Sequence, residues 1–135
     1  MYPQPYQDLT DAELLGLCVY REARGEPDEG KRGVAHVVMN RVKAPSWWGT
    51  SVLTVVTHPW QFSSFNENDP NVDIWPKDTD PVWADCLTIA ENVLDGTAED
   101  LTDGCNSYYD VSIPPPRWAG TNPALAIGRL RFYKL

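Results

Sequence analysis

The sequence predicts a mostly helical α+β domain with a small β region. Apolar residues recur at helical spacing in three long segments, whereas the last third of the chain carries alternating and looped segments. The chain has 135 residues, of which 42% are hydrophobic, so it can bury one core but has little room for a second folded module. We therefore expect residues 1–135 to form a single domain.

The first helix is expected over about residues 10–24, from a capping box formed by Thr10 and Glu13 to a stop at Gly25. Its apolar stripe consists of Leu14, Leu15, Cys18 and Val19. Residues 1–9 contain prolines, and we expect them to form a loose tail or to drape over the surface.

Two further helices have start and stop signals of their own. The acidic residues 28–29 can cap a second helix, which Pro45 stops. Asp80 followed by Pro81 is a strong start for the third helix, which Gly96 stops. The sequence therefore predicts three helices of several turns each.

The remaining segments are less regular. Between the second and third helices, prolines interrupt short apolar pieces, so we expect a short helix near residues 51–56 and then loops or a hairpin. The last third contains an aromatic piece at 107–109, a proline run at 114–116 and an alternating segment at 126–133. These three pieces are typical of strands or loops.

Composition excludes several classes of partner. Nineteen acidic and 11 basic residues give a formal net charge of −8, and this lacks the positive field that phosphate-backbone binding needs. No stretch approaches the length of a membrane span, and the first residues lack the basic and apolar regions of a signal peptide. We expect a monomer made in the cytoplasm, with no nucleic-acid partner and no stable membrane insertion.

The sequence also lacks motifs for metals, cofactors and covalent nucleophiles. Cys18, Cys86 and Cys105 have no CxxC spacing, and we expect them to be reduced, buried thiols. His36 and His58 lie far apart without an HExxH motif, so no metal is expected. Neither GxSxG nor a glycine-rich phosphate loop occurs, and we expect no cofactor.

Glu22 is the first candidate catalytic residue. It follows Leu15 by seven residues and Cys18 by four, so helical geometry places its carboxyl on the face that enters the core. Desolvation favours the neutral form of a carboxyl, which can then donate a proton to a leaving oxygen. The alternative is a structural ion pair with one of three nearby arginines, Arg21, Arg24 or Arg41.

Glu26 lies about one helical turn further on, but Gly25 and Pro27 disturb the helix there. It is either a second carboxylate or a structural residue. Two carboxyl groups across a glycosidic bond would suit glycoside hydrolysis. Three other acids in the loop-rich middle segment could approach from the opposite side of a cleft: Glu67, Asp69 and Asp73.

Two segments combine aromatic rings with amide and hydroxyl groups. One holds Gln61, Phe62 and Ser63, and the other holds Asn106, Tyr108, Tyr109 and Trp118. Aromatic faces can cover the apolar C–H surface of a pyranose while short polar groups bind its hydroxyls and N-acetyl amides. The two segments are therefore candidate sugar-binding sites, although small aromatic cores beneath loops would give the same pattern.

Six stretches of sequence resemble the cell-wall hydrolases of the spore-cortex-lytic (SleB) type. They are YREARGE at 20–26, GKRGVAHVVMNRV at 30–42, QFSSFN at 61–66, SYYD at 107–110, PRW at 116–118 and AIGRLRFY at 126–133. The resemblance implies a lysozyme-like fold. It also implies that Glu22 is the catalytic acid, that Gln61, Phe62 and Ser63 line the cleft, and that Tyr108 faces it. The chain departs from many relatives at Arg21, where they have Gly, and at Leu130, where they have His.

The resemblance implies cleavage of the β-1,4 bond between N-acetylmuramic acid and N-acetylglucosamine, with peptidoglycan strands as the partner. In a lytic transglycosylase the muramoyl C6 hydroxyl attacks and Glu22 then acts as base, whereas a muramidase would need a second acid such as Glu26 to activate water. The lack of a convincing second acid favours the transglycosylase. Alternatives are a non-catalytic wall-glycan binding module and a phage structural protein. A phage endolysin would reach the wall through a pore made by a partner.

Overall fold

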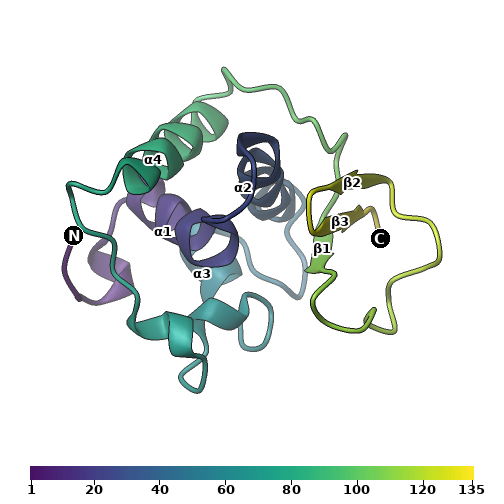
Figure 1. Ribbon diagram of the computed structural model, residues 1–135, viewed down its shortest axis with the longest axis horizontal. Coiled ribbons are helices and arrows are strands. Elements are labelled where there is room, and N and C mark those ends of the chain that lie inside the picture. The colour runs from purple at the N-terminus through teal and green to yellow at the C-terminus, as the bar shows by residue number, and fades with distance from the viewer.

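A computed structural model describes residues 1–135, and its helices pack around a central one (Figure 1). The central helix is α1, which contacts the other three helices directly. The four α-helices are α1 (Asp11–Ala23), α2 (Asp28–Lys43), α3 (Val52–Thr57) and α4 (Pro81–Leu94). The three long helices and the short one lie where the sequence predicts them. No helix is both long and apolar enough to cross a membrane.

Local hydrogen bonds explain where the helices begin. The hydroxyl of Thr10 accepts the backbone N–H of Glu13 at 3.1 Å, and the Glu13 carboxylate accepts the N–H of Thr10 at 2.9 Å. The Asp80 carboxylate caps α4 by accepting the N–H of Val82 at 2.9 Å. Both predicted caps are confirmed. The cap predicted for α2 is wrong, because the N-cap residue is Pro27. The acidic residues 28–29 lie in the first turn, where their negative charges interact favourably with the positive end of the helix dipole.

Residues 58–80 contain no hairpin. Two short 3-10 helices, η2 (Ser63–Phe65) and η3 (Pro70–Asp73), form there instead. The Asp69 carboxylate caps η3 by accepting the N–H of Asn71 at 2.8 Å. Of the two alternatives that the sequence leaves open for this region, loops are therefore correct. Prolines explain this result, since they lack the N–H that strand pairing needs.

A small antiparallel sheet lies beside α2 (Figure 1). Its strands are β1 (Ser107–Asp110), β2 (Leu125–Ile127) and β3 (Leu130–Tyr133), in the order β1-β3-β2. The alternating segment at 126–133, predicted to be strand-like, contains a turn at Gly128 that divides it into β2 and β3. Gly128 has a φ of +52°, which glycine adopts without strain.

The first nine residues drape over the surface rather than hanging loose. Tyr6 lies in a short 3-10 helix, η1 (Tyr6–Asp8), and its ring packs against those of Phe65 and Trp75 at centroid distances of 5.1 and 5.9 Å. The terminal amine donates to the carbonyl of Pro76 at 2.8 Å. These contacts attach the N-terminal segment to the region of η2 and η3.

The hydrophobic core is centred on α1, and it includes all three cysteines, which are free and buried as the sequence predicts. The sheet joins this core through Phe132, which lies against Gly33 of α2. A Cβ atom built on Gly33 would lie only 2.5 Å from the Phe132 ring. The small residue at position 33 therefore lets the sheet approach the helix closely.

Gly33→Ala is expected to lower the free energy of unfolding by about 1–3 kcal/mol, because the new methyl group would overpack against Phe132. Chemical denaturation monitored by circular dichroism would measure the change. Gly25→Ala is a suitable control, since a Cβ atom there would meet nothing within 4 Å. A Gly33→Ala variant as stable as the control would contradict the close approach of sheet and helix.

Candidate active site

Glu22 lies in the last turn of α1, and its half-buried carboxyl group is held by two donors from other parts of the chain. The hydroxyl of Tyr108 in β1 donates to Oε1 at 2.6 Å. The backbone N–H of Ser64 in η2 donates to Oε2 at 3.2 Å. Three elements that are distant in sequence thus fix the orientation of one carboxyl group.

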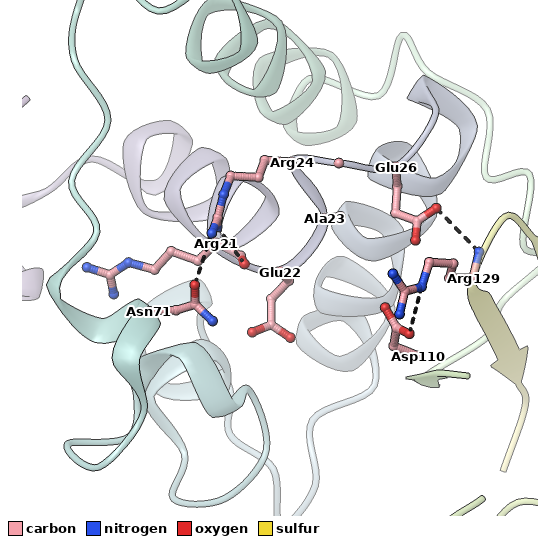
Figure 2. A pocket seen from close by; sticks show the side chains of 9 residues that line it. Arg21, Glu22, Ala23, Arg24, Glu26, Asn71, Asp110 and Arg129 are labelled. Atoms are coloured by element: carbon pink, nitrogen blue, oxygen red, sulfur yellow. Dashed lines mark hydrogen bonds and ion pairs between the residues drawn. The ribbon is translucent and has the colours of Figure 1, made fainter. Parts of the chain in front are cut away.

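None of the three nearby arginines forms an ion pair with Glu22. Arg24 donates to the side chain of Asn71 at 3.2 Å, away from the Glu22 carboxyl (Figure 2). Arg41 donates to the carbonyl of Asn106 at 2.7 Å and to the side chain of Gln61 at 3.2 Å. The structural ion pair that was the alternative role for Glu22 is therefore absent.

Arg21 points away from Glu22, and its side chain is buried, with 4% of the residue exposed. Its guanidinium lies among the rings of Tyr6, Phe65 and Trp75, with the central carbon 4.9 to 5.5 Å from their centroids. It donates to the carbonyls of residues 72 and 74 at 2.8 and 2.9 Å. Arg21 therefore ties the η2–η3 region, and with it the N–H of Ser64, to the helix that carries Glu22.

A cleft of about 460 Å³ opens over the Glu22 carboxyl. Seven of the nine predicted site residues line it: Glu22, Gln61, Phe62, Ser63, Tyr108, Tyr109 and Trp118. Tyr109 and Trp118 form an aromatic wall together with Tyr133, with ring centroids 5.4 to 6.3 Å apart. The cleft therefore combines one carboxyl group with aromatic faces and short polar groups.

A second hollow, of about 340 Å³, adjoins the cleft and shares four lining residues with it: Arg21, Glu22, Asn71 and Asp110. Figure 2 shows Glu26 and Arg129 on its far side, with Asp110 between them and Glu22. Asp110 lines both the hollow and the cleft. Its carboxylate lies 3.4 Å from Nε of Arg129 and accepts the N–H of Ser112 at 2.8 Å.

The model of the cell wall hydrolase family matches residues 25–133. This chain belongs to the cell wall hydrolase family. The matched stretch contains both walls of the cleft and begins just after Glu22. The family match therefore covers most residues around the Glu22 carboxyl group but not Glu22 itself. The role of Glu22 is inferred from its position and hydrogen bonds.

The curated relatives that resemble this cell wall hydrolase are spore cortex-lytic enzymes. A spore cortex-lytic enzyme of Oceanobacillus iheyensis is 31% identical over 134 residues, which are 98% of this chain and 44% of that protein. A spore cortex-lytic enzyme of Halalkalibacterium halodurans is 28% identical over 124 residues, which are 91% of this chain and 34% of that protein. The chain thus spans less than half the length of these relatives.

A solved structure confirms the predicted α+β fold and the SleB-type resemblance. The catalytic domain of the Bacillus cereus SleB protein aligns with a TM-score of 0.68 at 26% identity, over 98% of this chain and 95% of that chain. The similarity therefore extends over the helices, the sheet and the cleft of this cell wall hydrolase.

Two residues that the sequence assigns to the site do not line the cleft. Glu26 turns toward the β2–β3 turn, where its carboxylate accepts the N–H of Arg129 at 3.4 Å (Figure 2). Asn106 does not line the cleft, because its side chain bonds to both backbone groups of Leu135, at 3.0 and 3.1 Å. Both contacts hold the backbone of the sheet region in place.

Phe62 is at the cleft but is only 2% exposed. Its ring lies 6.3 Å from that of Tyr108 and belongs to the core. Phe62 therefore supports Tyr108 from beneath, and it has little surface to offer a sugar. At this position the aromatic-core interpretation of the segment is the correct one.

The sequence interpretation missed Asp110 and Asn71, which line both the cleft and the hollow. A signal for Asp110 was available, since residues two apart in a strand share a face and Tyr108 precedes it by two. Asn71 follows no such pattern. The three other acids lie outside the cleft: Asp69 caps η3, Glu67 lines a separate hollow and Asp73 is exposed.

Proposed function

We propose that this chain is a lytic transglycosylase that cleaves peptidoglycan strands between N-acetylmuramic acid and N-acetylglucosamine. The observation that carries the proposal is the setting of Glu22. Its carboxyl group faces a cleft, accepts hydrogen bonds from Tyr108 and Ser64, and has no cationic partner. A carboxyl group held in one orientation beside a cleft has the position that general acid catalysis requires.

In the first step the protonated Glu22 donates its proton to the bridging oxygen as the glycosidic bond breaks, which leaves an oxocarbenium-like muramoyl residue. The Glu22 carboxylate then removes the proton from the C6 hydroxyl of that residue as the hydroxyl oxygen bonds to C1. The product is a 1,6-anhydro end, and Glu22 has regained its proton. Tyr108 and Ser64 keep donating to the carboxylate between the two steps.

The lack of an available second base favours this route over hydrolysis. The Glu26 carboxylate accepts the N–H of Arg129 in the β2–β3 turn. The Asp110 carboxylate lies beside the Arg129 side chain and accepts the N–H of Ser112. Both carboxylates are thus engaged by other parts of the protein. Hydrolysis by a muramidase remains the second candidate function, because Asp110 lines the cleft together with Glu22.

Mass spectrometry of the fragments released from purified peptidoglycan tests the proposal. Muramic residues with 1,6-anhydro ends are the expected products. Reducing muramic ends would favour the muramidase with Asp110 as base. Reducing N-acetylglucosamine ends, or released peptides with intact glycan, would contradict both candidates.

A further inference from the structure

Trp60 combines an unfavourable backbone conformation with an exposed side chain. Its φ of +67° lies in the left-handed region, which bulky residues rarely adopt and which costs free energy. Its indole is 74% exposed, so burial offsets little of that cost. The turn is held by the Asn66 side chain, which accepts the N–H of Trp60 at 3.2 Å. Folding alone therefore gives no reason for a tryptophan at this position.

A hollow of about 530 Å³ lies beside the indole. Its lining is Thr57, Pro59, Trp60, Phe65, Asn66, Glu67 and Asn68. The hollow thus offers two aromatic residues, two amides, a hydroxyl and a single carboxylate, and no lysine or arginine. This lining suits a neutral ligand with both apolar and hydroxyl-bearing faces, and it disfavours an anion such as the carboxylate of a stem peptide.

The hollow belongs to the same loop as one wall of the catalytic cleft. Trp60 directly precedes residues 61–63, which line the cleft, and Ser64 then donates to Glu22. Phe65 follows and lines the hollow again. The cleft and the hollow have no lining residue in common, but consecutive residues of this loop line the hollow, then the cleft, then the hollow again. Trp60 is thus the direct neighbour in the chain of the residues that form the cleft wall.

We propose that this hollow is a distal subsite for an N-acetylated pyranose, with Trp60 as the surface on which the sugar stacks; this inference rests on the proposed function. The C–H face of the ring lies on the indole, which fits the strong apolar character of an exposed aromatic face. The side chains of Asn66, Asn68 and Thr57 bind hydroxyl and acetamido groups. The subsite strengthens binding of long strands and takes no part in proton transfer.

The test uses Trp60→Asn, because asparagine tolerates the left-handed conformation but offers no ring. In a Glu22→Gln background, which slows turnover enough to measure binding, the dissociation constant for peptide-free glycan strands is expected to rise by about tenfold, the equivalent of one stacking contact. Trp60→Phe, which keeps a ring, is expected to recover most of the affinity. Trp47→Ala is the matched control, because Trp47 is 62% exposed but does not line the hollow.

Equal affinity of Trp60→Asn and Trp47→Ala for the strands would overturn the subsite. A marked fall in Tm of Trp60→Asn together with lost affinity would also overturn it, since Trp60 would then be structural. We expect instead an unchanged or higher Tm, because backbone strain is relieved. The proposed function fails separately: if the Glu22→Gln protein still cleaves the strands, Glu22 is not the acid, whatever Trp60 does.

Discussion

Replacing Glu22 by glutamine is expected to lower the rate of glycan cleavage by about 10²- to 10⁴-fold, which is the usual contribution of a positioned general acid. The amide has nearly the same shape: its oxygen can still accept the N–H of Ser64 and its NH2 group can donate to the Tyr108 hydroxyl oxygen, but it can neither protonate the leaving oxygen nor act as a base. Clearing of a peptidoglycan suspension, followed by quantification of the released ends, measures the rate.

Glu26→Gln is the matched control for this experiment. Glu26 is on the same segment but bonds to the β2–β3 turn, and glutamine can still accept the N–H of Arg129. We expect its cleavage rate to stay within about threefold of the unmodified protein, a change worth less than 1 kcal/mol. A large loss in Glu26→Gln with a small loss in Glu22→Gln would reverse the assignment of the catalytic carboxyl group.

Tyr108→Phe is expected to lower kcat by about 10- to 100-fold and to leave KM nearly unchanged, because it removes a hydrogen bond to the reacting carboxyl group but little substrate contact. Burial and the neighbouring Glu22 carboxyl raise the pKa of Tyr108 well above its usual value. Its hydroxyl therefore remains a donor throughout the neutral and mildly alkaline range. Steady-state kinetics with soluble glycan strands separate the two constants.

The Tyr108→Phe variant should fold normally, since the phenylalanine ring keeps the same packing neighbours. Phe62 and Phe132 lie 6.3 and 5.8 Å from it between ring centroids. An unchanged Tm would therefore assign the fall in kcat to the lost hydroxyl. If kcat were unchanged instead, Tyr108 would have no positioning role.

The helices could be predicted from the sequence because their signals are local. The capping box at Thr10 and the Asp80 cap each involve residues two or three apart, and the apolar stripe of α1 repeats within one turn or two. The division of residues 126–133 into two strands was missed, because alternation continues through the turn at Gly128. Only the pairing of β3 with β1 on one side and β2 on the other reveals that turn.

The candidate site was predictable only in part, because some of its contacts join residues that are far apart in the sequence. Glu22 stands out because its spacing from Leu15 and Cys18 places a carboxyl group on an apolar helix face. Its partner Tyr108 lies 86 residues away, and no local pattern joins the two. Asn106 resembled a sugar ligand by residue type, yet it bonds to the backbone of Leu135. Contacts to backbone atoms leave no trace in the pattern of side chains.

Digestion in water enriched in ¹⁸O shows whether water enters the product at the carbon where Glu22 promotes bond cleavage. We expect muramic ends released by the unmodified protein to lack one water and to carry no ¹⁸O, and the Glu22→Gln protein to release almost none of them. Muramic ends that carry ¹⁸O at C1 would contradict transglycosylation, and their undiminished release by Glu22→Gln would contradict the role of Glu22 as well.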